Sequence, residues 1–156
     1  MVQSWQNPDG LYILYGTDQG VRGSRAGVTT GAGKRRELVL EVDLTGAART
    51  IYTADLNNDG TAEGFADGRN TPIPTNAIIT KQTAVVETAL AGGTNYAVGT
   101  YQGDGTVDTA NGIRTTAGAD GAQIGTQLSA ERYVSVVTTG TYTAGKVKII
   151  IEYITN

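Results

Sequence analysis

The sequence contains no cysteine and no histidine. Their absence excludes disulfides, thiol chemistry, histidine-dependent acid–base catalysis and the usual zinc sites. It also has 1 methionine and few leucines, whereas glycine reaches 22 residues and threonine is abundant, so good helix formers are scarce. The N-terminus lacks the apolar core of a secretory signal, and no apolar run approaches the length of a membrane span. We therefore expect a soluble, non-exported, β-rich protein that does not bind membranes.

Charge is distributed unevenly along the 156 residues, whose net charge is −3. Residues 1–36 hold five basic and two acidic residues, a balance of +3, and residues 37–156 hold seven basic and thirteen acidic residues, a balance of −6. This asymmetry predicts a basic arm on an acidic body, although a solvated loop without a partner would look the same. An acidic body repels phosphates, so nucleic-acid binding is disfavoured.

Alternating apolar and polar residues predict several strands. The clearest are residues 37–44 and 146–154; the others are 11–15, 73–91, 94–102 and 132–138. Residues 16–36 are rich in glycine, serine and threonine without periodicity, and we expect a long loop there. Residues 107–114 could form a short helical turn. We therefore divide the chain into an N-terminal strand with a basic, glycine-rich arm (1–36) and a sandwich domain (37–156).

Asp-Gly and Asn-Gly pairs, which favour tight turns, separate these strands. Asp-Gly occurs at 9–10, 59–60, 67–68, 104–105 and 120–121, and Asn-Gly at 111–112. Short alternating strands joined by such turns predict an all-β fold, an antiparallel jelly-roll-like β-sandwich with an extended N-terminal arm.

One stretch resembles the start of a calcium loop. Asp55, Asn57 and Asp59 alternate and Gly60 follows, as in the pattern D-x-[DN]-x-[DN]-G. Position 12 of that pattern needs a bidentate glutamate, and Ala66 stands there instead. A hairpin turn needs the same residues for its left-handed conformations, and we favour the turn over a metal site.

Catalytic equipment is equally sparse. No serine lies in a G-x-S-x-G elbow, and no histidine is present to act as its base. The acidic residues fall mostly in Asp-Gly turns or on polar strand faces, where solvation explains them. We expect neither an enzyme nor a cofactor.

The aromatic and basic residues near the N-terminus are candidates for a binding surface. Trp5, Tyr12 and Tyr15 precede the arm, and tryptophan and tyrosine are typical interface anchors. Packing on the first strand is an equally good account of the two tyrosines. The full set of predicted contact residues is Trp5, Tyr12, Tyr15, Arg22, Arg25, Lys34, Arg35 and Arg36.

Three stretches of the chain resemble a known family: PTNAIITKQTAVVETAL, NYAVGTYQGDGTVDTANGIRT and GTYTAGKVKIIIEY. Together they are similar to the head-decoration, or cement, proteins of tailed bacteriophages, especially of marine phages. The features in common are a proline-led strand over 73–91, a Gly-x-Tyr-x-x-Asp-Gly-Thr strand and turn over 99–106, and a Thr-Ala-Gly-Lys turn over 143–146. The resemblance covers roughly residues 73–154.

The resemblance implies a jelly-roll-like sandwich that binds the outer surface of an icosahedral capsid and reinforces it. The implied partner is the major capsid protein, the implied assembly is a small homo-oligomer, with a trimer favoured, and the implied location is the virion surface, after synthesis in the host cytoplasm. Lys34, Arg35 and Arg36 would meet acidic capsid surface. Two other functions stay open, a tail or baseplate component that binds a receptor and a carbohydrate-binding module.

Overall fold

The computed structural model describes residues 3–6, 12–15, 24–30, 34–52 and 72–155, with side chains from residue 34 onward. Its elements are all strands: β1 (Gln3–Gln6), β2 (Tyr12–Tyr15), β3 (Ser24–Thr30), β4 (Arg35–Asp43), β5 (Thr50–Tyr52), β6 (Ile78–Ala91), β7 (Asn95–Tyr101), β8 (Val107–Arg114), β9 (Tyr133–Thr139) and β10 (Ala144–Ile154).

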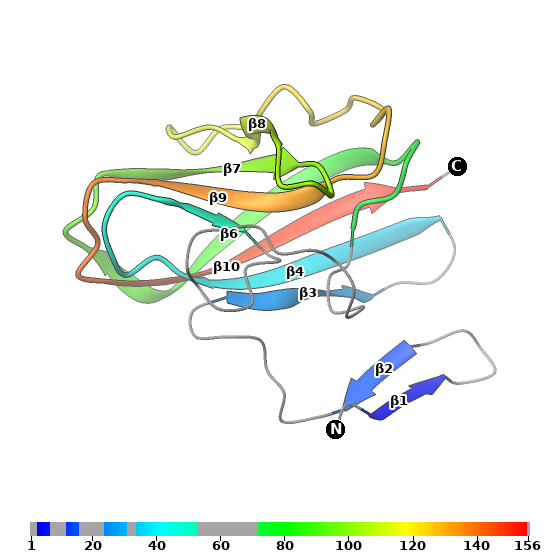
Figure 1. The fold of residues 1–156 in the computed structure, drawn as a ribbon, viewed down its shortest axis with the longest axis horizontal. Coiled ribbons are helices and arrows are strands. Elements are labelled where there is room, and N and C mark those ends of the chain that lie inside the picture. The colour runs from blue at the N-terminus through cyan, green and yellow to red at the C-terminus, as the bar shows by residue number, and fades with distance from the viewer. Residues whose placement is uncertain (1–2, 7–11, 16–23, 31–33, 53–71, 156) are drawn as a thin grey trace.

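Eight of the strands form two four-stranded antiparallel sheets. We call β3-β4-β10-β6 the first sheet and β5-β9-β7-β8 the second sheet. Figure 1 shows β7 and β9 of the second sheet lying over β4 and β10 of the first. The chain passes from the first sheet to the second between β4 and β5, returns at β6, crosses again to β7 and comes back at β10. These repeated crossings give jelly-roll-like connectivity, so the predicted all-β sandwich is confirmed.

The alternation in β4 and β10 explains how the sheets bury their core. Leu38, Leu40 and Val42 of β4 are buried, as are Val147 and Ile149 of β10, while the residues between them face outward. The remaining core side chains come from both sheets and from segments between the strands, and include Leu44, Ile51, Ile73, Ile79, Tyr96, Val98, Ile113, Val134, Val136, Tyr142, Ile151 and Tyr153.

Two predictions about local structure are wrong. Residues 24–30 are not loop, because β3 pairs antiparallel with β4, and a register shift between Arg25 and Val28 accommodates the small residues between them. Residues 107–114 hold no helical turn, because they form β8, which pairs with β7 and also contains the Asn-Gly pair. In both segments, pairing with a neighbouring strand overrides weak local propensity. Residues 16–23 and 31–33 lie outside the described residues.

Other expected features occur where the sequence places them. The turn after β7 contains the Asp104-Gly105 pair, and Gly105 has a φ of 87°. Its backbone N–H donates to Gln102 O at 2.9 Å, and Gln102 N donates to Thr106 O at 2.8 Å. The two prolines near residue 73 precede β6, which begins only at Ile78. Two short strands, β1 and β5, were not predicted.

Candidate interaction surfaces

The aromatic residues predicted to bind a partner lie in a separate hairpin. β1 and β2 pair only with each other among the described strands, with Trp5 opposite Ile13, Tyr12 opposite Gln6 and Tyr15 opposite Gln3. The backbone therefore brings these three residues into one small two-stranded sheet. It does not bring them to the basic run.

The basic residues divide among three places. Arg22 lies outside the described residues, and Arg25 occupies β3 opposite Glu41. Lys34, Arg35 and Arg36 stand at the beginning of β4, all exposed, so the run belongs to the first sheet and not to a loop before it. The backbone N–H of Thr155 donates to Lys34 O at 2.8 Å, which fastens the end of β10 beside this run.

Arg35 is engaged within the protein. Its guanidinium donates to the Glu152 carboxylate, and the Lys81 ammonium lies 3.9 Å from the same carboxylate. The hydrogen bond and the charge of Glu152 raise the pKa of Arg35, and the hydrogen bond from Arg35 lowers the pKa of Glu152. Within the described part of the chain, Lys34 and Arg36 make no ion pair. We call these two exposed residues the cationic corner.

A second row of charges crosses the outer face of the first sheet. Lys148 of β10 lies 2.7 Å from Glu87 of β6 and 3.4 Å from Glu41 of β4. The hydrogen bond to Glu87 is the main reason that the pKa of Lys148 is raised. This row and the row formed by Arg35, Glu152 and Lys81 neutralise most of the charge in the middle of this face. Exposed ion pairs of this kind contribute little stability.

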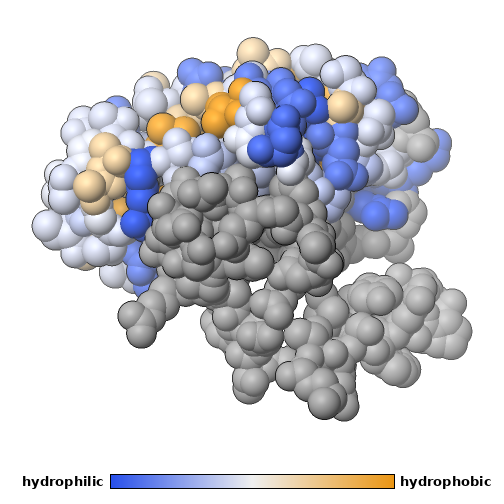
Figure 2. All heavy atoms as spheres, viewed as in Figure 1, coloured by the Kyte–Doolittle hydropathy of each residue, from blue (hydrophilic) through white to orange (hydrophobic). Residues whose placement is uncertain are grey.

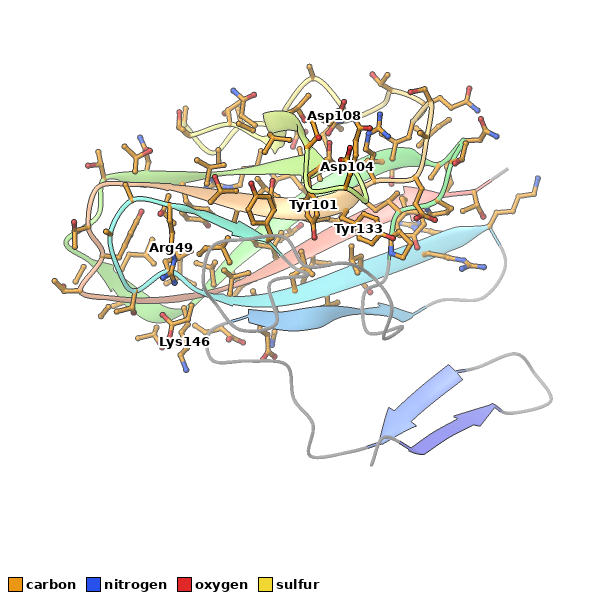
Figure 3. All side chains as sticks on the ribbon, in the orientation of Figure 1. Arg49, Tyr101, Asp104, Asp108, Tyr133 and Lys146 are labelled. Carbon is orange, nitrogen blue, oxygen red and sulfur yellow. The ribbon has the colours of Figure 1, made fainter. Side chains whose placement is uncertain are left out.

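Tyrosines gather on the outer face of the second sheet. The rings of Tyr101 and Tyr52 meet edge to face at 5.0 Å, and those of Tyr101 and Tyr133 lie 5.5 Å apart. Tyr101 is fully buried, and Figure 3 shows it beside Tyr133. Burial, together with the hydrogen bond that Tyr133 donates to Glu131 at 2.9 Å, raises the pKa of Tyr133 to about 12.

This tyrosine cluster does not offer the exposed aromatic surface that a sugar would need. Among the side chains that the structure describes, the large exposed apolar ones are all aliphatic. Figure 2 shows that hydrophobic residues on the visible face form only small groups between polar ones. The described residues therefore give the carbohydrate-binding alternative no support.

A partly buried polar network connects β7, β8 and the segment before β9. Gln123 Nε2 donates to Thr100 Oγ1 at 2.9 Å and to Asp108 Oδ2 at 3.1 Å. Arg132 Nε donates to the same Asp108 oxygen at 3.0 Å. Because these groups satisfy one another, the network fixes residues 115–132 against the second sheet, and we assign it a structural role. No sequence motif indicated it.

Among the described side chains, the large exposed apolar ones gather mainly at the outer edge of β6. Four large hydrophobic side chains of the described residues are exposed, and three lie on β6: Val85 at 46%, Val86 at 51% and Leu90 at 38%. β6 is an edge strand, paired on one side with β10. On its other side, described residues reach it through bridges only at Ile78 and Ile79.

The calcium prediction falls on residues the structure does not describe, because Asp55, Asn57 and Asp59 lie within 53–71. Across residues 34–52 and 72–155, no three acidic side chains come together as a metal site would require. In the described ranges no helix has the length and hydrophobicity to cross a membrane.

Comparison with known protein families, curated proteins and solved structures finds no match to this chain.

Proposed function

We propose that the chain is a structural protein of a tailed bacteriophage that binds the outer surface of the capsid and stabilises it. The resemblance over residues 73–154 suggests this function, and the sandwich fold agrees with it. The observation that carries the proposal is the cationic corner, in which Lys34 and Arg36 are exposed at the start of β4, where Arg36 pairs with β10 and pairing with β3 begins one residue later at Glu37.

The strand pairing gives the corner a defined position without a large entropic cost on binding. The backbone of Arg36 is opposite Tyr153 of β10, whose side chain is buried, and Lys34 O accepts the bond from Thr155. Two cations held in this way can meet an acidic capsid surface and increase the association rate. Arg35 contributes less in this proposal, because its charge is already paired with Glu152.

The test is co-sedimentation of the purified protein with expanded capsids that have been stripped of this protein. A K34E/R36E double variant should bind more weakly than the parent, and its binding should depend less on salt, since charge-driven association is screened by ions.

K146E is the matched control. Lys146 is also exposed on the first sheet, but it lies at the opposite end of β10, as Figure 3 shows. Equal losses in K34E/R36E and K146E would mean that net charge, and not the corner, governs binding. Failure of the parent protein to bind intact capsids would move the proposal to the tail, where the copy number per virion identifies the component.

A further inference from the structure

The outer edge of β6 has the properties of a strand-pairing surface. After Ile79, described residues form no further bridge to this side of β6, and the strand continues to Ala91. The burial pattern shows that every residue from Val85 to Ala91 is exposed. Proteins usually block such edges, because unpaired backbone groups recruit another strand. Here the edge instead carries Val85, Val86 and Leu90.

The charges along this edge are arranged symmetrically. Lys81 and Glu87 lie three residues on either side of Ala84. When an antiparallel strand pairs with a copy of itself, residues at equal distances from the centre stand opposite each other. A pairing centred on Ala84 therefore places Lys81 of each copy opposite Glu87 of the other copy.

We propose that β6 pairs antiparallel with β6 of a second copy of this chain, around a twofold axis at Ala84. Within one copy Lys81 lies 3.9 Å from Glu152 and Glu87 lies 2.7 Å from Lys148, and across the axis Lys81 and Glu87 then add two equivalent ion pairs to these rows of charge. Val85 lies opposite Thr83 of the other copy, and Val86 lies opposite Gln82, so both exposed valines become covered. The two first sheets join into one continuous eight-stranded sheet.

The rest of the fold limits where this pairing can occur. Gly125 N donates to Ile79 O at 2.7 Å, so the segment around Gly125 occupies the edge at the beginning of β6. The pairing therefore runs over residues 81–87, within which Gln82 Nε2 also donates to Asp120 Oδ1 at 3.2 Å. Register shifts between β6 and β10 fall between Ile79 and Lys81, between Val86 and Thr88, and between Thr88 and Ala91, so β6 is regular from Lys81 to Val86.

This inference does not depend on the proposed function, because it concerns the free protein. It also favours a dimer over the trimer that the resemblance implied, since the charge pattern is complementary only about a twofold axis.

Charge exchange tests the pairing. K81E places two glutamates opposite each other at each end of the interface, and E87K places two lysines there. By sedimentation velocity, each variant alone should dimerise roughly tenfold more weakly than the parent or worse, because opposed like charges repel. A mixture of K81E and E87K should form heterodimers, because every opposed pair in that combination is attractive. The K81E/E87K double variant should again form homodimers.

The exposed Lys146 provides the control, since K146E changes the same net charge as K81E but lies outside β6. It should dimerise as the parent does. Melting temperatures of all variants establish that they remain folded. A monomeric parent, a trimer, or single variants that do not associate when mixed would each overturn the proposal.

The register can be tested separately because the chain has no cysteine. In the A84C variant the two introduced thiols stand side by side on the same face of the joined sheet, the face on which Ala84 packs against the core, at the Cα separation that both an antiparallel pair and a disulfide require. Diamide, which accepts the two electrons and two protons, should join the copies into a covalent dimer. T88C is the control, because Thr88 lies opposite Thr80 and not its own copy. Equal cross-linking of both variants would overturn the register.

Discussion

The two sheets bury their faces differently. β10 in the first sheet alternates between buried and partly exposed residues, so its outer face meets solvent. In the second sheet every residue of β7 from Tyr96 to Tyr101 is buried, and β9 is buried from Tyr133 to Val136. The second sheet thus has a covered layer on both faces, whereas the first has one core face and one surface face. The two surfaces on which the proposals rest, the cationic corner and the outer edge of β6, both belong to the first sheet.

The largest difference should appear when a large side chain is removed from each outer face. Tyr101→Ala should lower the free energy of unfolding by about 3–5 kcal/mol, because it empties a fully buried site. Ile150→Ala, on the partly exposed face of β10, should cost about 1 kcal/mol. Urea unfolding measures both. Similar losses would show that the two outer faces are equally buried.

Adding a single methyl group should reveal the same contrast. A Cβ atom on Gly99 of β7 would lie 1.8 Å from Thr109 O in β8, so Gly99→Ala must move these strands apart and should cost about 1–3 kcal/mol. Ala89→Val enlarges an exposed residue of β6 and should change the free energy of unfolding by less than about 0.5 kcal/mol. If Gly99→Ala unfolds at the same urea concentration as the parent, β7 and β8 are not closely packed.

Alkaline pH should affect the second sheet first. The pKa of Tyr133 is raised to about 12 in the folded protein from the ordinary 10.0 of tyrosine, so the folded state favours the protonated phenol. Its contribution to stability is complete below pH 10 and is lost as the pH rises towards 12. Urea unfolding across this range measures the loss. Tyr133→Phe, whose side chain cannot ionise, should lose less free energy of unfolding over this pH range. An equal loss in the variant and the parent would mean that another group is responsible.

Acidic pH should act on the first sheet, with the smallest effect. Arg35 lowers the pKa of Glu152 below its ordinary 4.5, so the ionised carboxylate favours folding above that pH. The contribution is lost as the pH falls through the lower folded value. Arg35→Gln should reduce this dependence when melting temperature is followed from neutral to acidic pH. An identical dependence in both proteins would mean that the pair contributes nothing.

The sequence predicted those features that depend on local alternation. β4 and β10 were found because each places apolar residues on one face, and the two sheets followed from their spacing and turns. β3 and β8 could not be found in this way, since their glycine-containing sequences become strands only beside β4 and β7.

The candidate surfaces were harder to predict from the sequence. The sequence identified the basic run. It did not show that Arg35 is paired within the protein and so differs from Lys34 and Arg36, because Arg35 and its partner Glu152 are 117 residues apart. The exposed edge of β6 was missed for a related reason. Its β-branched residues predict a strand equally well at the centre or at the edge of a sheet, and only the topology decides which.

The bond between Thr155 and Lys34 has a practical consequence for attaching cargo to this protein. A peptide or fluorophore joined after residue 155 emerges beside the cationic corner, where, if the proposed function holds, it would obstruct a docked capsid. The turn between β9 and β10 lies at the other end of β10, ten residues and roughly 30 Å away at the rise of an extended strand. Cargo placed in that turn would remain outside the contact, so the two attachment sites form a matched pair for mapping which end of the sandwich faces the shell.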